Sequence, residues 1–153
     1  DKYPKSICHL LLLPQPSFLQ VSGPSELRRE HLSALRKLHR VARRVAEEQR
    51  AARPALTFRI GYHAVPSMKP LHLHIISEDF SGPSLKTKKH WNSFASEFFI
   101  HAEDLEKRLE SEGRIALDRE YYNDLLKQSL RCFRCNASMR TLPKLKEHLR
   151  ECR

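Results

Sequence analysis

The sequence predicts an α+β fold followed by a small C-terminal unit built around cysteine and histidine. Three observations lead to this prediction. Short runs of strand-forming residues occupy positions 10–13, 56–62 and 71–76. A longer stretch, residues 25–53, repeats apolar side chains at the three- and four-residue spacing of a helix. Three of the four cysteines lie after residue 127.

Length and composition limit the class of protein. The chain has 153 residues, of which 40% are apolar and 30% charged, as expected for one folded domain or a smaller domain with an appendage. No apolar run approaches the roughly 20 residues that a bilayer requires. The start, Asp1-Lys2-Tyr3-Pro4, has neither the apolar region nor the cleavage site of a signal peptide. We therefore expect an intracellular protein with no membrane span.

The charge of the chain is strongly positive and unevenly distributed. The formal net charge is +10 and the pI is about 9.8, which favours a polyanionic partner, nucleic acid first and acidic membrane second. Residues 127–153 contain eight Lys and Arg against two Glu and therefore carry +6, which leaves +4 for the first 126 residues. More than half of the excess charge thus coincides with the cysteine-rich end.

The strands are predicted from short apolar runs bounded by turn formers. Residues 10–13 are all leucine and end at Pro14, which is typical of a buried strand. Residues 56–62 and 71–76 are separated by a connector that contains proline, and a hairpin is their simplest arrangement.

The longest helix is predicted over residues 25–53. Ser25 is a plausible N-cap, and Pro54 marks the exit. The arginines between the apolar positions are interpreted as a solvated face. The apolar positions themselves are Leu27, Leu32, Leu35, Leu38, Val41, Ala42 and Val45.

The middle of the chain is predicted to contain a lysine-rich loop and two further helical segments. Residues 82–91 contain three lysines and no acid, and we expect a loop there with Trp91 packed beneath it. Phe94, Phe98 and Phe99 follow at helical spacing, and Gly113 suits the end of the next helix. Residues 114–130 are expected to form a helical linker.

The cysteine and histidine spacing at the end predicts a zinc site. Cys132 and Cys135 are followed by His148 and Cys152, which are four residues apart and share one face of the helix that Pro143 could open. Four such ligands suit one tetrahedral Zn²⁺ ion. The alternatives are incidental thiols or a disulfide. A finger that binds protein instead of nucleic acid also stays open.

Two histidines share one face of the last predicted strand. Because side chains alternate, His72 and His74 point to one side, and Leu71, Leu73 and Ile75 to the other. Surface histidines, satisfied buried histidines and a metal pair are the alternatives. A cationic, hydroxyl-containing neighbourhood favours phosphoryl or nucleotidyl transfer instead. Its members are His63, Ser67, Lys86, Lys88, Lys89 and His90.

These residues carry a resemblance to a known family. His72-Leu73-His74-Ile75-Ile76 resembles the histidine-triad signature, while residues 61–68 and 88–94, with the C-terminal finger, narrow it to the aprataxin family. The resemblance runs from Asp1 to Arg150. It implies a histidine-triad (HIT) domain with an antiparallel sheet and flanking helices over residues 1–113, a linker over 114–130 and a zinc finger over 131–153.

The resemblance implies an enzyme that hydrolyses the adenylate from 5'-adenylated DNA, an intermediate of abortive ligation. His72 would be the nucleophile that forms an adenylyl-histidine, with His74 and His63 as the other catalytic residues. The nucleotide and phosphates would be bound by Ser67, Lys89, His9 and Met68. DNA contacts are expected from Lys86, Lys88, Lys144, Lys146 and Arg134.

The same resemblance implies the partners and the cofactor. The substrates would be nicked or broken DNA ends, including RNA–DNA junctions, and AMP would be a product. We expect a nuclear monomer with one structural zinc ion and no cofactor in catalysis.

Three features depart from the family pattern. Pro70 stands where the triad has its first histidine, so that a proton-relay role and a backbone N–H are missing there. Cys152 replaces the more common histidine ligand. From the resemblance we also expect the chain to begin inside the catalytic domain, without elements that help to form the nucleoside pocket.

Two other functions remain open from the sequence. One is a non-catalytic DNA-end-binding adaptor with a degenerate triad, which Pro70 motivates. The other is a general nucleoside phosphoramidate hydrolase, against which the basic finger argues.

Overall fold

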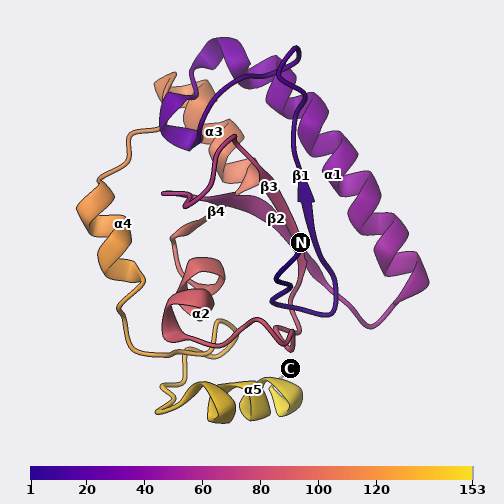
Figure 1. Ribbon diagram of the computed structural model, residues 1–153, viewed down its shortest axis with the longest axis vertical. Coiled ribbons are helices and arrows are strands. Elements are labelled where there is room, and N and C mark those ends of the chain that lie inside the picture. The colour runs from indigo at the N-terminus through magenta and orange to yellow at the C-terminus, as the bar shows by residue number, and fades with distance from the viewer. Residues whose placement is uncertain (153) are drawn as a thin grey trace.

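The computed structural model describes residues 1–152, which fold around one four-stranded antiparallel sheet (Figure 1). The strands are β1 (His9–Leu12), β2 (Phe58–His63), β3 (Leu73–Ser77) and β4 (Phe99–His101), in the order β1-β3-β2-β4. Strands β2 and β3 are antiparallel neighbours, which confirms the hairpin. Together with the helices, this sheet confirms the predicted α+β class with an antiparallel sheet.

Strand β4 corrects the sequence prediction of a helix through Phe98 and Phe99. It pairs with β2 in the register Tyr62 to Ile100. The sequence could not indicate this strand, because three residues are too few to show the two-residue alternation of a strand and because its partner strand is distant in sequence. Gly61 permits the close approach, because a Cβ there would lie 2.3 Å from the Ile100 carbonyl oxygen.

Helix α1 (Leu32–Ala52) begins seven residues later than Ser25, the predicted N-cap. Two 3₁₀ turns, Pro24–Glu26 and Arg29–His31, precede it. Between them Arg28 is extended, since it forms an antiparallel bridge with Arg114. The neighbouring Arg29 N–H donates to the Gly113 carbonyl at 3.0 Å. Tertiary pairing therefore delays the helix that the local pattern predicts.

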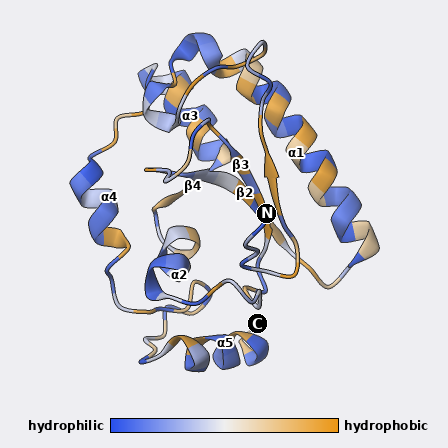
Figure 2. Cartoon of the chain, viewed as in Figure 1, coloured by the Kyte–Doolittle hydropathy of each residue, from blue (hydrophilic) through white to orange (hydrophobic). Residues whose placement is uncertain are grey.

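Helices α1, α3 (Ala102–Glu112) and α4 (Arg119–Leu125) share one core with the sheet. Hydrophilic and hydrophobic residues alternate along α1, as Figure 2 shows, and its apolar side is buried. Gly113 ends α3 in the left-handed conformation with φ of 75°, as predicted. The segment after Gly113 is packed rather than free, since Tyr122 and Leu125 belong to this core.

A second core joins the opposite side of the sheet to α2 (Lys88–Ala95) and α5 (Leu142–Glu151). Helix α2 occupies the end of the predicted lysine loop and is capped by Thr87, whose side chain accepts from the His90 N–H. Trp91 is buried beneath these lysines and donates from Nε1 to the Arg131 carbonyl at 3.0 Å. None of the helices within residues 1–152 has the length and apolar character to cross a bilayer.

Candidate active site and metal centre

Strands β1, β2 and β3 bring four histidines together on one side of the sheet. Leu73 and Ile75 point into the core with α1, so the alternating pleat directs His74 to the other side. The ring centroids of His72 and His74 are 5.0 Å apart, in agreement with the predicted shared face. His63, at the end of β2, lies 4.4 Å from His74 between ring centroids. His9, at the start of β1, completes the cluster.

Hydrogen bonds fix which ring nitrogens carry protons. The Pro70 carbonyl lies 3.0 Å from His72 Nδ1 and can only accept. Nδ1 therefore donates, and Nε2 of neutral His72 keeps its lone pair. The Lys5 backbone N–H donates to His9 Nδ1 at 3.2 Å, so His9 must donate from Nε2 to His74 Nδ1 at 3.0 Å. Neutral His74 consequently carries its proton on Nε2.

Two of these ring nitrogens are buried without a partner. Within residues 1–152, His63 Nε2 and His74 Nε2 have no hydrogen-bond partner. Leaving such a group unsatisfied costs roughly 1–3 kcal/mol. Burial also lowers the pKa of His9 and His63 from 6.5 to about 3, and that of His74 well below its usual value. His9, His63 and His74 are thus neutral, and the two unpaired nitrogens suit the site to bind a polar ligand.

A cavity of about 500 Å³ opens onto this cluster. That volume is in the range of small-molecule and cofactor sites. All seven predicted catalytic and nucleotide-binding residues line it: His9, His63, Ser67, Met68, His72, His74 and Lys89. The structure therefore brings together residues that the sequence places up to 80 positions apart.

Other residues of the cavity were not predicted. Lys5 lies in the N-terminal segment, and burial lowers its pKa. Asn123 and Leu126 reach the cavity from α4 and the residue after it. Their place depends on long-range packing, for which the sequence has no local signal. The aromatic side of the cavity comes from Phe94 and Phe98.

Acid is expected to destabilise the fold through this cluster. Unfolded histidine binds a proton near pH 6.5, whereas folded His9 and His63 do so near pH 3. Stability should therefore fall as the pH drops from 6.5 toward 3, by up to about 1.4 kcal/mol per pH unit for each histidine. Urea unfolding at several pH values tests this. His9→Asn should reduce the slope, while His31→Gln, outside the cluster, should retain it; a flat profile for the unmodified chain contradicts the assignment.

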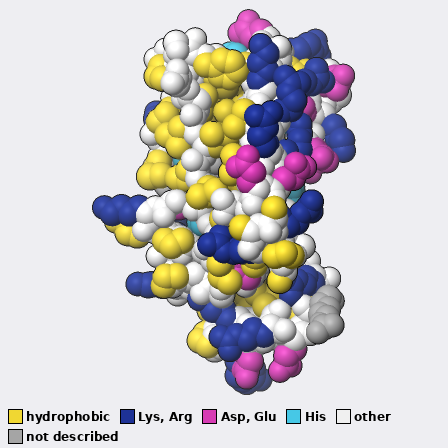
Figure 3. Space-filling model, turned by 90° about the vertical axis from the view of Figure 1, so that its right-hand side faces the viewer, with side chains coloured by type: hydrophobic (Ala, Val, Ile, Leu, Met, Phe, Trp, Pro, Cys, Tyr) yellow, Lys and Arg dark blue, Asp and Glu magenta, His cyan; other side chains and the backbone are white. Residues whose placement is uncertain are grey.

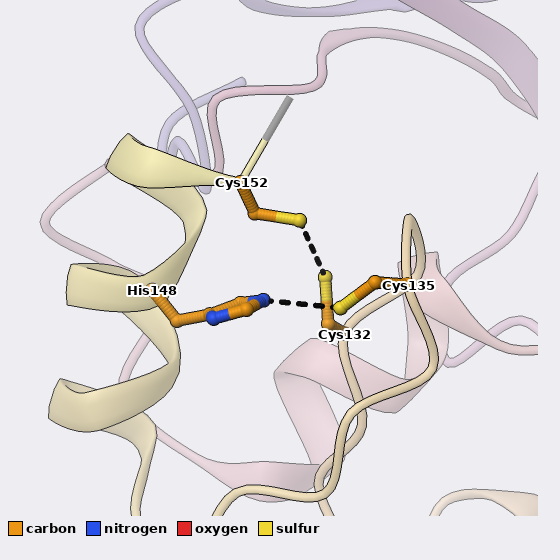
Figure 4. A group of neighbouring side chains, drawn as sticks. All are labelled: Cys132, Cys135, His148 and Cys152. Atoms are coloured by element: carbon orange, nitrogen blue, oxygen red, sulfur yellow. Dashed lines mark hydrogen bonds between the residues drawn. The ribbon is translucent and has the colours of Figure 1, made fainter.

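The four predicted metal ligands converge at the C-terminal end (Figure 4). Cys132 and Cys135 come from the turn before α5, His148 from α5 and Cys152 from its C-cap. All four donor atoms lie within 4.8 Å of one another. Cys132 Sγ and Cys152 Sγ are 3.9 Å apart, close to the roughly 3.8 Å between two thiolates on one tetrahedral zinc. This separation also excludes a disulfide between them.

The donor set fits one structural zinc ion, held by Cys132, Cys135, His148 and Cys152. Three thiols and one imidazole are soft ligands that close a tetrahedral site and leave no position for catalysis. The Arg134 N–H donates to Cys132 Sγ at 3.4 Å, which supports the negative charge of a thiolate. The ion would stabilise the finger and would take no part in the reaction.

The finger is fixed to the catalytic domain by Arg59. Its guanidinium pairs with Glu78 at 2.7 Å, donates to the Phe94 carbonyl and lies 4.6 Å from the ring centroid of Phe133 in the finger. Leu145 and Leu149 of α5 share the second core with Trp91 and Phe94. Zinc binding and the catalytic cavity are thus connected through one apolar core.

The predicted DNA-binding residues divide into two groups. Lys86, Lys88 and Lys144 are exposed, and Lys88 shares a hollow at the base of the finger with Arg140. Lys146 donates to the Gly82 carbonyl at 3.3 Å, so it also contacts the catalytic domain.

Arg134, which the sequence predicts to contact DNA, also has contacts within the protein. Its guanidinium donates to the carbonyl oxygens of Leu149, Cys152 and Glu78. Arginine near the end of a helix satisfies the last carbonyl groups, so these contacts indicate a structural role. Arg134 joins the end of α5 to the catalytic domain.

Comparison with known proteins agrees with both parts of the site. A family model described as "Scavenger mRNA decapping enzyme C-term binding" matches residues 1–90, and one described as "C2HE / C2H2 / C2HC zinc-binding finger" matches residues 95–153. Aprataxin of Gallus gallus is 45% identical over 151 residues, which cover 99% of this chain and 46% of that protein. The chain therefore spans about half the length of this relative.

In two other matches, this chain covers a larger share of the matched protein's length. An aprataxin-like protein of Schizosaccharomyces pombe is 33% identical over 165 residues, covering 99% of this chain and 68% of that protein. The crystal structure of aprataxin ortholog Hnt3 in complex with DNA has a TM-score of 0.76 and 33% sequence identity, covering 99% of this chain and 79% of that one. The buried histidine cluster, the Cys₃His centre and these matches together show that the chain belongs to the aprataxin family.

Proposed function

We propose that the chain is a DNA 5'-adenylate hydrolase, which removes AMP from abortive ligation intermediates in single-strand break repair. One observation carries the proposal: the lone pair of His72 Nε2 is left free by the Pro70 contact in a cavity of nucleotide size. An oriented, unprotonated imidazole is the nucleophile that nucleotidyl transfer through a covalent intermediate requires.

The reaction would proceed in two displacements at the phosphorus of AMP. His72 Nε2 forms an N–P bond while the bond to the DNA 5'-phosphate breaks, and the departing DNA keeps that electron pair. Water then attacks the adenylyl-histidine, the N–P bond breaks, and a proton from water returns to solvent. The products are AMP and DNA with a free 5'-phosphate.

Neutral donors and lysines would stabilise the charge that develops on the phosphoryl oxygens. His74 Nε2–H is a buried donor without a partner among residues 1–152, and an oxygen of the transferring group would satisfy it. Lys89 lines the cavity from the first turn of α2. Lys5 and Ser67 line the same cavity, so cationic and hydroxyl groups are both available.

The basic finger would hold the nucleic acid beside this cavity. Lys89 lines the cavity, and Lys88, next in the same helix, lies against the base of the finger, so positive charge continues from one to the other. Lys86 and Lys144 would contribute further phosphate contacts. The solved relative in complex with DNA supports DNA as the partner. We expect the chain to act in the nucleus, where adenylated DNA ends arise.

A non-catalytic DNA-end adaptor is the second candidate, because Pro70 replaces a triad histidine. The contact that orients His72 uses the backbone carbonyl at position 70, which proline retains. This geometry favours the enzyme over the adaptor.

Substrate comparison tests the proposal. AMP release should be measured on a 5'-adenylated nicked duplex, on an adenylated RNA–DNA junction and on a small adenosine phosphoramidate. Adenylated nucleic acid should give a kcat/KM at least about tenfold higher, because phosphate contacts outside the cavity add binding energy. Faster turnover of the small adenylate would instead indicate a general phosphoramidate hydrolase. Binding of the nicked duplex without AMP release would indicate the adaptor.

A further inference from the structure

Helix α1 carries a second concentration of positive charge, far in sequence from the finger. Residues 32–52 contain six Lys and Arg against two Glu, a net +4, which equals the net charge of the first 126 residues together. The charge of α1 is therefore comparable to the +6 of the C-terminal segment. The outward side of the helix, called here the α1 basic face, consists of Arg36, Lys37, Arg40, Arg43 and Arg44.

Most of the α1 basic face is exposed and uncompensated. Arg36 forms ion pairs with Glu106 and Glu110 of α3, each at 3.4 Å. Lys37, Arg40 and Arg44 are exposed and form no ion pair with any group of residues 1–152. Figure 3 shows Lys and Arg side chains gathered on the side of the molecule where α1 lies. Three like charges at i, i+3 and i+7 repel one another unless an anion covers them.

The α1 basic face is separated from the catalytic cavity by the sheet. Leu73 and Ile75 of β3 belong to the core that holds α1, whereas His72 and His74 line the cavity on the other side. The basic face points away from that core, since Leu35, Leu38 and Ala42 occupy the buried side of α1. The contacts that would hold a nucleic acid end in the cavity are therefore separate from the contacts that the α1 basic face offers.

The chemistry of the face favours a nucleic acid backbone over a membrane. Peripheral helices insert an apolar side into lipid, and the apolar side of α1 is occupied by the protein core. The charges span nine residues, about 12 Å of helix. A duplex presents roughly seven phosphates over that length on both strands, about half of them on one strand. Three or four phosphate contacts are thus within reach.

We propose that the α1 basic face is a second nucleic-acid-binding surface, which takes a duplex backbone independently of the cavity and the finger. Its recognition is electrostatic, because Lys37, Arg40 and Arg44 present exposed cations. The protein would hold a second segment of nucleic acid on the side opposite to the one being processed.

The test compares two triple variants of the full chain. Lys37→Gln/Arg40→Gln/Arg44→Gln removes three charges from the face with residues that keep helix propensity. Lys2→Gln/Lys107→Gln/Arg119→Gln removes the same charge from dispersed exposed positions. Calorimetric titration with an unmodified 10-base-pair duplex at low salt should give two duplexes per chain for the parent and the dispersed variant, and one for the α1 variant. For the site that the α1 variant loses, the slope of the logarithm of the association constant against the logarithm of salt concentration should be near −3.

Hydrolysis of a small adenosine phosphoramidate by the same proteins separates this proposal from the catalytic one. All three proteins should turn it over at equal rates, and inactivity of all three would bear on the catalytic proposal alone. Unchanged stoichiometry in the α1 variant overturns the second surface. An equal loss in the dispersed variant overturns it too, because net charge would then be the cause. Loss of binding to phosphatidylserine vesicles with unchanged duplex stoichiometry would assign the face to membranes instead.

Discussion

Replacing His72 by alanine is expected to lower AMP release from 5'-adenylated DNA by a factor of about 10³ or more. The substitution removes the atom that would form the N–P bond, and loss of a covalent nucleophile typically costs rate factors of this size. A thousandfold loss corresponds to about 4 kcal/mol of transition-state stabilisation. Single-turnover assays with labelled adenylate measure the rate and can trap the adenylyl-enzyme, which the variant should not form.

His31→Ala is the matched control, since His31 lies before α1 and does not line the cavity. Both variants should bind adenylated DNA as the parent does. If His72→Ala releases AMP at the parental rate, or still accumulates labelled protein, another residue is the nucleophile.

Removal of zinc is expected to have the second large effect. Structural zinc contributes on the order of 10 kcal/mol to small fingers, so a chelator or Cys132→Ser should unfold the segment from Cys132 to Cys152. Affinity for nicked DNA should fall at least about tenfold, because the finger carries much of the basic charge. Hydrolysis of a small adenylate should fall less, since His72 lies directly before β3, outside the finger.

The shared core extends this prediction to the catalytic domain. Leu145 and Leu149 of the finger pack with Trp91 and Phe94, and Phe94 lies edge-on to His74. The melting temperature of the whole chain should therefore fall on chelation, as measured by calorimetry. Cys8→Ser changes a cysteine outside the metal site and should retain one zinc per chain. Unchanged DNA affinity after chelation would show that the finger is not the anchor.

The features predicted from sequence are those encoded locally. The shared face of His72 and His74 follows from the alternation of a strand, and the zinc ligands follow from the spacing of a turn and a helix. The predictions that were wrong concern segments whose conformation depends on contacts distant in sequence. Residues 25–31 have helical periodicity, but the bridge between Arg28 and Arg114 imposes an extended conformation that no local pattern indicates.

The cavity was predicted only in part for the same reason. Ser67 and Lys89 were predicted because they lie near the histidine strand in sequence. Asn123 and Leu126 enter the site because the segment after Gly113 packs against the core, which depends on contacts across the whole chain. The role of Arg134 also required the structure, since its acceptor carbonyls lie in α5 and next to β3.

The contacts of Arg59 have a geometrical consequence for any nucleic acid that reaches both ends of the site. Because its guanidinium joins Glu78 to Phe133, Arg59 opposes a hinge motion of the finger relative to the histidines. The finger and the histidine cluster are thus held at a constant separation. We expect a strand that reaches both to bend or unstack to fit that separation, so that the deformability of the nucleic acid would decide which ends are accepted.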